Sequence, residues 1–413
     1  MIGMTKMKIK RILVSAVAAA FASVSLFAGC TQEPTAKETS EKTSAVSRVS
    51  DVSDTSSDSS EKDESSETQS SSESSYEEES NTSTENSDES SEEEPKVSNI
   101  TPAVWEVTDQ NGNNIYMMGS IHLADENASV LPDYFETAYA KCDALAVECD
   151  ITQSSDALTS LMAYMYNDGT SIKDHVPEET YKKSVDTLKK GGMYSPTFDM
   201  MKPIMWVEIG EILAARKSGL SSEYGVDLNL LNRAKSENKE ILEIESLDFQ
   251  NHLLSNMDED IQLILFEELA DENYIEDGIE QIKSLYDNWK KGDISEDLTD
   301  EESEDSDTDP EKEELIKRYN ALMLDDRNVG MAEAAEEYML DGKKVMVVVG
   351  AAHFYGENGI LSLLEKDGCT VRKLTAEDAQ NVSKPEESAE SSEEVSKTPS
   401  IPLETDPGIA RAA

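Results

Sequence analysis

Short apolar runs separated by polar turns mark the strands of a folded segment that spans residues 99–379. Ala103–Val107 and Asn114–Ser120 stand on either side of a polar turn that contains Asn111 and Gly112. Two strand-like runs around an Asn-Gly pair predict a β-hairpin. Four further runs predict strands at Ala144–Val147, Glu240–Ile244, Lys343–Val349 and Cys369–Leu374.

Between these runs, apolar positions recur at helical spacing, and Pro132 gives a helix-start signal. The predicted helices are Pro132–Lys141, Pro177–Lys190, Trp206–Lys217, Asp227–Asn238, 259–290, 311–340 and Asn358–Lys366. Strands that alternate with helices predict an α/β fold, with a mixed sheet, βαβ units and an inserted helical region. About 280 residues suffice for one core, so we expect a single globular domain at 99–379.

The beginning of the chain has the pattern of an export signal. Basic residues cluster between Lys6 and Arg11, and the apolar run Ile12–Phe27 is too short for a comfortable membrane span. The run ends in Ala28-Gly29-Cys30, which resembles the lipobox of bacterial lipoproteins. The resemblance implies removal of residues 1–29 and a lipid on the Cys30 thiol; the alternative is an ordinary secreted protein. We therefore expect an exported domain, anchored by this lipid to the cell membrane and facing outside.

Composition separates this domain from the segments around it. Residues 31–98 contain 22 serines, 20 acidic residues and 5 basic residues, without Ile or Leu. Such a segment buries too little apolar surface to offset its ordering entropy, so 30–98 is predicted to be a disordered tether. The tail at 380–413 has the same character, and the acidic stretch at 292–314 is predicted to be a solvated loop within the domain.

Charge and cysteine content exclude several classes of protein. The net charge of −51 argues against nucleic acid as a partner. No Cys-x-x-Cys pair occurs, so a thiolate zinc site is not expected. Cys142 and Cys149 lie in apolar stretches and read as small core residues. Whether a disulfide forms among Cys142, Cys149 and Cys369 is left open.

Two of the four histidines share one local pattern. His122 closes Gly119-Ser120-Ile121-His122 and His353 closes Gly350-Ala351-Ala352-His353, each directly after an apolar strand. The carboxyl ends of strands in α/β sheets are where binding sites form. Glycine at the start of each pattern lets the chain leave the strand sharply. Imidazole at such a place suits a metal ligand or a general base.

Glu148 adds a carboxylate at a third strand end, directly after Ala144–Val147. A carboxylate at the end of a buried strand requires a partner. Two histidines and one glutamate form a usual three-ligand metal site with an open position for water. The structural alternative is that each histidine is a satisfied buried residue. Ser120 lacks the Gly-x-Ser-x-Gly context of a serine hydrolase.

Taken in order, the motifs of the chain resemble the TraB/GumN family. The segments that carry the resemblance are Trp105–Val107, Gly119–Leu123, Leu131–Pro132, Ala146–Asp150, Tyr224–Asp227, Leu242–Ser246 with Gln250, Asp326–Asn328, Val348–Gly356, Gly359–Ile360 and Leu363–Leu364. They span nearly the whole predicted domain. The resemblance implies an α/β domain shared with the Tiki metalloproteases and, more distantly, with erythromycin-esterase-like and ChaN-like proteins.

The resemblance also implies a site. The family's two Gly-x-x-His motifs and its glutamate map to His122, His353 and Glu148, with manganese or cobalt rather than zinc as the expected metal. The two histidines are expected to bind the metal or to activate water, and Glu148 to be a third ligand or the general base. Arg327 is then expected to stabilise negative charge on a substrate carbonyl, the alternative being a surface salt bridge. Glu245 is a candidate for binding substrate or for supporting a residue that does so. Asp227 is a candidate substrate-binding residue and is equally suited to support a helix.

Three classes of function follow. The first is a metal-dependent hydrolase at the cell surface that cleaves a peptide or amide bond in a peptide or small-molecule substrate. The second is a binding or regulatory protein on the same fold that captures a peptide signal without turnover. The third is a structural surface protein. Turnover that requires both His122 and His353 as well as Glu148 would distinguish the enzyme from the other two.

Overall fold

The computed structural model describes residues 97–153, 157–298 and 309–379. The predicted leader at 1–29 and the tail at 380–413 lie outside the described residues, as does the predicted tether apart from its last two positions. In the part of the chain that is described, no helix has the length and apolar character needed to cross a membrane.

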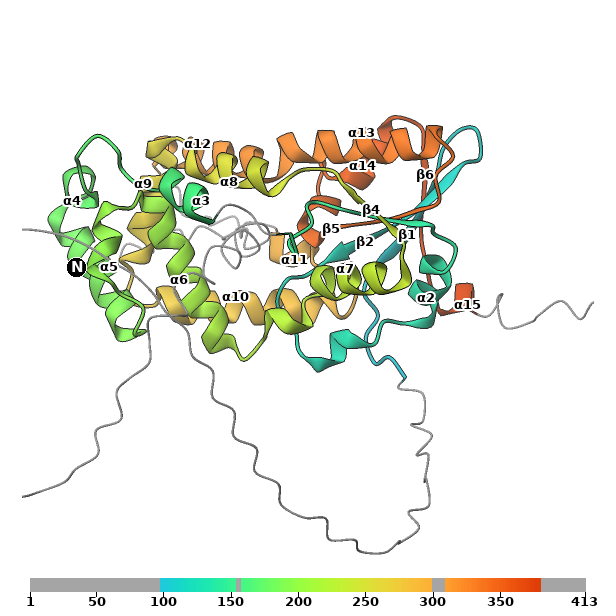
Figure 1. Cartoon of the computed structure of the whole chain (residues 1–413), viewed down its shortest axis with the longest axis horizontal. Helices are drawn as coiled ribbons and strands as arrows, with labels where there is room; N and C mark the ends of the chain where they lie inside the picture. Colours follow the sequence, from blue (N-terminus) through green and yellow to red (C-terminus); the bar gives the residue numbers. More distant parts are fainter. Residues whose placement is uncertain (1–96, 154–156, 299–308, 380–413) are drawn as a thin grey trace, which may run out of the picture. The chain divides into compact units, whose positions relative to one another are not determined.

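Six strands form one mixed sheet, as the sequence predicts (Figure 1). The strands are β1 Val104–Thr108, β2 Asn114–Ser120, β3 Ala144–Val147, β4 Glu240–Glu243, β5 Val345–Gly350 and β6 Thr370–Lys373. Their order is β4-β3-β5-β2-β1-β6. The pairs β4–β3, β3–β5 and β5–β2 are parallel, whereas β1 is antiparallel to both β2 and β6. The βαβ unit predicted at the end of the domain joins β5 to β6. These two strands are not neighbours in the sheet, because β2 and β1 lie between them.

Most of the helices lie in the connection between β3 and β4 and in the connection between β4 and β5. Between β2 and β4 the structure has η1 Glu126–Ser129, α2 Asp133–Tyr139, α3 Ala157–Ala163, α4 Ile172–His175, α5 Glu178–Lys190, η2 Pro196–Met200, α6 Pro203–Ser218, η3 Ser222–Tyr224 and α7 Val226–Glu237. After β4 it has α8 Leu247–Ser255, α9 Glu259–Leu269, α10 Tyr274–Trp289, α11 Ser295–Leu298, α12 Pro310–Asn320, η4 Ala321–Asp325, α13 Asp326–Leu340, η5 Ala351–Phe354, α14 Ile360–Lys366 and α15 Ala376–Ala379.

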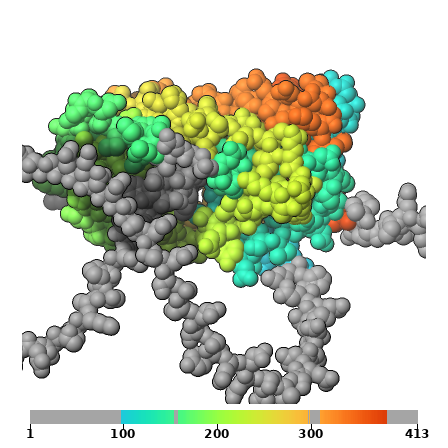
Figure 2. Space-filling view, viewed as in Figure 1, coloured from blue at the N-terminus to red at the C-terminus, as the bar shows by residue number. Residues whose placement is uncertain are grey.

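Helices cover both faces of the sheet. Alternate strand residues such as Met118 and Val147 pack with α2, α7 and the end of α10. Their neighbours Met117 and Ala146 pack on the opposite face with α13 and α14. Figure 2 shows α7, in yellow-green, at the surface of the molecule. Burial on both faces explains why β5 is apolar at every position before Gly350.

A second core lies among the inserted helices α3 to α6, α8, α9 and α12, together with the first part of α10. Trp206 is fully buried at its centre and has edge-on contacts with Phe198 and Phe266. The indole N–H of Trp206 donates to the Phe198 carbonyl at 2.9 Å. The predicted inserted helical region is therefore a packed unit with its own aromatic core.

Two predictions of secondary structure are wrong at their boundaries. The single helix expected at 259–290 is two helices, because Asp271 accepts a hydrogen bond from the Asn273 N–H and turns the chain between α9 and α10. The acidic stretch expected to be a loop at 292–314 includes α11 and the first turns of α12, while residues 299–308 lie outside the described ranges. Asp309 caps α12 by accepting from the Glu311 N–H, and Pro310 occupies a first-turn position.

Candidate functional site

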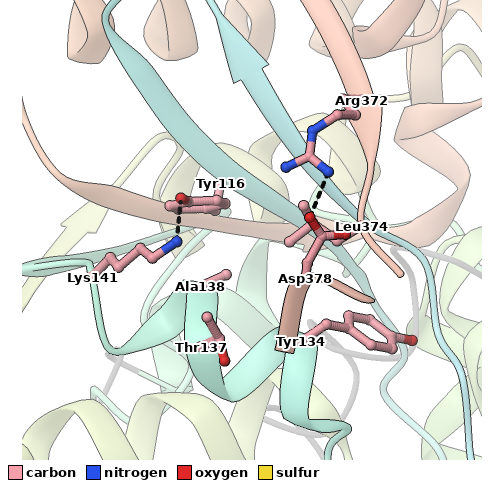
Figure 3. A pocket seen from close by; sticks show the side chains of 8 residues that line it. All are labelled: Tyr116, Tyr134, Thr137, Ala138, Lys141, Arg372, Leu374 and Asp378. Atoms are coloured by element: carbon pink, nitrogen blue, oxygen red, sulfur yellow. Dashed lines mark hydrogen bonds and ion pairs between the residues drawn. The ribbon is translucent and has the colours of Figure 1, made fainter. Parts of the chain in front are cut away.

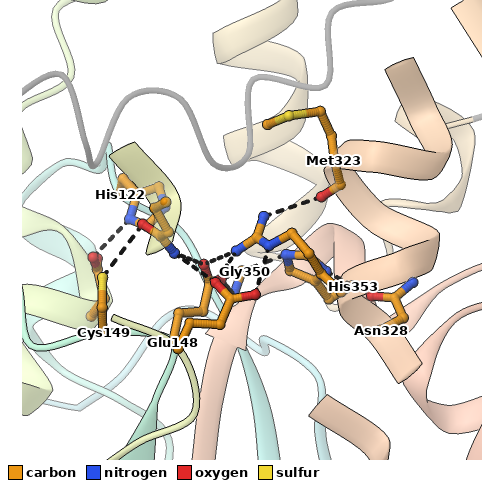
Figure 4. A network of polar contacts seen from close by, with 11 residues as sticks. His122, Glu148, Cys149, Met323, Asn328, Gly350 and His353 are labelled. Atoms are coloured by element: carbon orange, nitrogen blue, oxygen red, sulfur yellow. Dashed lines mark hydrogen bonds and ion pairs between the residues drawn. The ribbon is translucent and has the colours of Figure 1, made fainter. Parts of the chain in front are cut away.

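The parallel strands bring four predicted site residues to one edge of the sheet. β2, β3, β4 and β5 run in the same direction, so their carboxyl ends share an edge. His122, Glu148, Glu245 and His353 follow these ends within one to three residues. Figure 4 shows His122 on one side of the resulting polar network and His353 on the other, with Glu148 near its centre.

The two Gly-x-x-His turns pack against each other, which explains their first glycine. A side-chain carbon at Gly119 would lie 2.8 Å from the Cα of Ala351, in the turn that leads to His353. The described residues with positive φ do not include Gly119 or Gly350. The expected reason for glycine, a sharp exit from the strand, is therefore replaced at Gly119 by close approach of two backbones.

Glu148 is buried, and protein donors satisfy both of its oxygens. Oε1 accepts from the Gly350 N–H at 2.6 Å. Oε2 accepts from the Gln250 amide at 3.0 Å and from the Arg327 guanidinium at 2.8 Å. Burial acts to raise the pKa of Glu148, but the positive charge of Arg327 and the histidines outweigh it and lower the pKa to about 2. Glu148 is therefore ionised throughout the neutral range.

Arg327 joins the two carboxylates of the network. Its side chain is 2% exposed and donates from Nε and one Nη to Glu245, each at 2.8 Å, in addition to Glu148. Its other Nη donates to the Met323 carbonyl at 3.1 Å. Burial opposes its charge, yet Glu148 and Glu245 raise its pKa further above the usual value. Arg327 is thus a buried cation held between carboxylates, and the alternative of a surface salt bridge is wrong.

A π-helical turn at Ala321–Asp325 precedes Arg327 in what the sequence predicts as one continuous helix at 311–340. Such turns interrupt the regular helical rotation and recur at functional sites. The carbonyl of Met323, inside this turn, accepts from Arg327. Arg327 and Asn328 are buried at the first positions of α13. The turn thus fixes the rotation of α13 about its axis, and with it the direction in which Arg327 and Asn328 point.

His353 is fully buried, and one of its ring nitrogens is fixed by Asn328. Nδ1 lies 2.7 Å from the Asn328 carbonyl oxygen, whose amide donates to the Asn358 carbonyl at 2.9 Å. This arrangement assigns the proton to Nδ1 and leaves Nε2 as an acceptor. Nε2 has no hydrogen-bond partner among the described residues, and lies 3.7 Å from Glu148 Oε1. Burial lowers the pKa of His353 to about 4, against the opposing charge of Glu148.

His122 is held by a carboxylate instead of an amide. Its Nδ1 lies 2.7 Å from Oδ2 of Asp227, near the start of α7. Gly225, two residues earlier, approaches the His122 carbonyl so closely that a Cβ there would lie 2.6 Å away. The side chains of His122 and Asp227 are 14% and 12% exposed. Asp227, predicted as a substrate-binding or helix-supporting residue, is placed to orient His122.

Two site residues had no role assigned from the sequence, although both lie in the motifs quoted above. Asn328 orients His353, and Gln250 donates to Glu148 and Glu245, each at 3.0 Å. Gln250 also accepts from the Cys149 thiol. Glu245, predicted either to bind substrate or to support a residue that does so, has both of its oxygens bonded within this network. For Asn328, the sequence signal was its position next to Arg327, because a polar residue beside a predicted site residue is a candidate for the same site.

The donor set fits the expected divalent metal only in part. His122 and His353 each have Nδ1 bonded to an oriented oxygen acceptor, as metal-binding imidazoles do. Glu148, the expected third ligand, is committed to Gly350, Gln250 and Arg327. Within residues 97–153, 157–298 and 309–379, no three side chains among His, Cys, Asp and Glu are grouped to hold a metal ion. The described residues therefore do not form the expected three-ligand centre.

The remaining two histidines lie apart from this network, whereas Cys149 contacts it through Gln250. His175 contacts Glu259 and Thr170 at the end of α4, and His252 contacts Asn256 on α8. Cys142, Cys149 and Cys369 are free thiols. Burial raises the pKa of Cys149, so this thiol beside Glu148 is unreactive at neutral pH.

The fold is an α/β fold with a mixed sheet. At the carboxyl ends of its parallel strands it gathers a preformed polar site, in which Glu148, Arg327 and His353 are buried and His122 is partly exposed. The chain belongs to the TraB/PrgY/gumN family, whose model matches residues 103–373. Uncharacterized protein YbaP of Escherichia coli (strain K12), and that of Shigella flexneri, are each 25% identical over 266 residues, or 64% of this chain and 92% of the relative. No solved structure matches the chain.

Proposed function

We propose that the domain is a hydrolase that cleaves a peptide or amide bond. The observation that carries the proposal is the pair formed by His353 Nε2 and Glu148 Oε1, two acceptors 3.7 Å apart inside a buried network. Two lone pairs at this distance repel each other unless a donor lies between them. A water molecule supplies two such donors, and the two acceptors would orient its lone pair toward a substrate carbonyl.

The protonation states suit this role. His353 has a pKa near 4 and is a neutral acceptor at pH 7, while Glu148 is ionised. In the proposed step, the water oxygen attacks the carbonyl carbon and one water proton moves to Nε2 of His353. The tetrahedral adduct then expels the amine, which takes the proton back from the imidazolium. Glu148 stabilises the transient charge on the ring, and Asn328 keeps the ring in its productive tautomer.

Arg327 contributes to this proposal through its charge. Its nitrogens already donate to Glu148, Glu245 and Met323, so a direct hydrogen bond to a substrate oxyanion would require rearrangement. Its cation keeps Glu148 ionised and offsets negative charge that develops on the substrate. The predicted oxyanion role thus becomes an electrostatic one.

The test is cleavage of a peptide library by the full chain, with His353→Gln and Glu148→Gln as variants and His252→Gln as a matched control. His252 is an exposed histidine on α8, and its Nδ1 lies 3.0 Å from the Asn256 amide nitrogen. Loss of a general base lowers turnover by about 10²–10⁴-fold, whereas the control keeps the rate of the native chain. A folded native chain that cleaves no peptide, or a His353→Gln variant that retains full activity, would overturn the proposal.

Metal content measured on the same samples tests whether the hydrolase uses a divalent metal ion. A manganese or cobalt ion is proposed on the resemblance and on the orientation of the two imidazoles. Stoichiometric metal that disappears in His122→Gln and His353→Gln would support it, and activity that survives a chelator would remove it. Binding of uncleaved peptide, retained in Glu148→Gln, would instead favour capture of a peptide signal.

We also propose that the domain works outside the cell membrane, held by a lipid on Cys30. The basic cluster, the apolar run and the Ala28-Gly29-Cys30 sequence support this placement. Labelled fatty acid should be incorporated by the native chain and not by Cys30→Ser. Equal incorporation by both chains would contradict the anchor.

A further inference from the structure

A cavity of about 290 Å³ lies between α2, β2, β6 and α15 (Figure 3). It is separate from the network described above, because Tyr116 pairs with Met346 near the start of β5 and Lys141 precedes β3. The cavity is thus on the side of the amino ends of the parallel strands. Its lining residues are Tyr116, Tyr134, Thr137, Ala138, Lys141, Arg372, Leu374 and Asp378.

Buried aromatic and aliphatic side chains form part of the wall of this cavity. The rings of Tyr116 and Tyr134 are buried, as are Ala138 and Leu374. The Tyr134 hydroxyl is satisfied because it donates to the Pro102 carbonyl at 2.8 Å. The cavity is near the lower limit of the usual volume of small-molecule sites, and its aromatic walls suit a compact flat or aliphatic body.

Lys141 is the one charged side chain of the lining that takes no part in a salt bridge within the described part of the chain. Arg372 donates to Glu106 from two nitrogens, at 3.1 and 2.7 Å, and to Asp378 at 2.7 Å. Lys141 has no carboxylate within ion-pair distance in the described part of the chain. Its ammonium lies 3.3 Å from the Tyr116 hydroxyl and 5.5 Å from the centre of that ring. Lys141 is therefore free of a protein carboxylate among the described residues and is available to pair with a carboxylate of a ligand.

We infer that this cavity binds a small monocarboxylate. Its carboxylate would pair with Lys141 and its apolar body would lie against Tyr116, Tyr134 and Leu374. One lysine without a salt bridge matches a single carboxylate. A phosphate monoester would bring a second negative charge close to Glu106 and Asp378, whose two charges already exceed that of Arg372. This inference does not depend on the proposed hydrolysis.

The test measures binding of benzoate and of hexanoate to the full chain. The readout is the NMR signals of ¹³C-labelled tyrosine, and benzamide is the neutral control compound. Lys141→Met should weaken binding about tenfold or more, because a charge-assisted hydrogen bond is lost. Lys343→Met is the matched control, since Lys343 lies at the same distance of 5.5 Å over Tyr338, away from the cavity. The Lys343→Met variant should bind both carboxylates with the affinity of the native chain.

The outcomes separate clearly. Carboxylate-selective shifts of the Tyr116 and Tyr134 signals that disappear in Lys141→Met support the site. Benzamide that binds as tightly as benzoate shows an apolar cavity without anion recognition and overturns the inference. Equal binding by Lys141→Met, or the absence of any shift up to the solubility of both carboxylates, overturns it as well.

Discussion

Glu148 and Glu208 are both buried glutamates, yet the structure moves their pKa values in opposite directions. Glu148 lies at the sheet edge against Arg327, and its pKa falls to about 2. Glu208 lies on α6 in the helical region, is 3% exposed, and has no hydrogen-bond partner for either oxygen among the described residues. Burial and the nearby Glu211 raise its pKa well above the usual value.

The difference teaches that burial alone does not determine the charge of a site. Desolvation disfavours both carboxylates, and only the presence of a buried cation reverses the result. The sheet edge therefore holds fixed charges at neutral pH, whereas α6 holds a carboxyl group that favours its proton. Charge that persists at pH 7 can act on a substrate, which is why the proposed chemistry lies at the sheet edge.

The largest effect is expected when the compensation at the sheet edge is broken. Arg327→Met would leave Glu148 and Glu245 without their shared cation and should lower the free energy of unfolding by about 3–5 kcal/mol. Urea unfolding of the full chain measures it. Arg233→Met is the control, because Arg233 pairs with Glu136 and Glu237 at a partly exposed position, and it should lose about 1 kcal/mol or less. Equal losses would contradict the comparison.

A second effect is the contribution of Glu148 to the pH dependence of the free energy of unfolding. A carboxyl pKa lowered from 4.5 to about 2 contributes stability that is complete above pH 4.5 and is lost as the pH falls toward 2. The contribution is about 3 kcal/mol, because each pKa unit corresponds to about 1.4 kcal/mol. Unfolding measured across this window should be less pH-dependent in Glu148→Gln. The same slope in both chains would show that Glu148 is not compensated.

A third and smaller effect, of the opposite sign, is expected at Glu208. Its raised pKa means that the native state binds the proton more tightly than the unfolded state, so stability falls as the pH rises above 4.5. Glu208→Met should therefore stabilise the chain at pH 7 by about 1–3 kcal/mol, and the gain should shrink toward pH 4.5. Glu280→Met, on the exposed side of α10, should change stability by about 0.5 kcal/mol at most. Destabilisation by Glu208→Met at pH 7 would refute this account.

A fourth effect, on a pKa and not on stability, sharpens the comparison at His353. Asn328→Asp replaces an amide by a carboxylate at a position 2.7 Å from Nδ1. The pKa of His353 should rise from about 4 by about 1–3 units, because an adjacent carboxylate favours the imidazolium. NMR titration of the imidazole checks this shift, and Asn251→Asp on α8 is the control. An unchanged pKa would show that Asn328 does not hold the ring.

Much of the fold follows from local patterns that the sequence displays. The strand boundaries of β2 and β3 agree with the prediction, because their apolar runs are bounded by turns or charged residues. Glu148 and His353 come within 3.7 Å because parallel strands place their carboxyl ends together. The break before α10 and the start of α12 were missed, since single side-chain caps decide them and periodicity does not.

The sequence by itself determined the α/β class, the helical insertion and the strand ends at which the two histidines and Glu148 stand, because hydrophobic periodicity and strand direction are local properties. Only the tertiary structure decided which charges are compensated. The pairing of Arg327 with Glu148 and the pairing of Asn328 with His353 arise between segments that are distant in sequence. The physical reason is that desolvation and Coulomb energies depend on which groups meet in three dimensions.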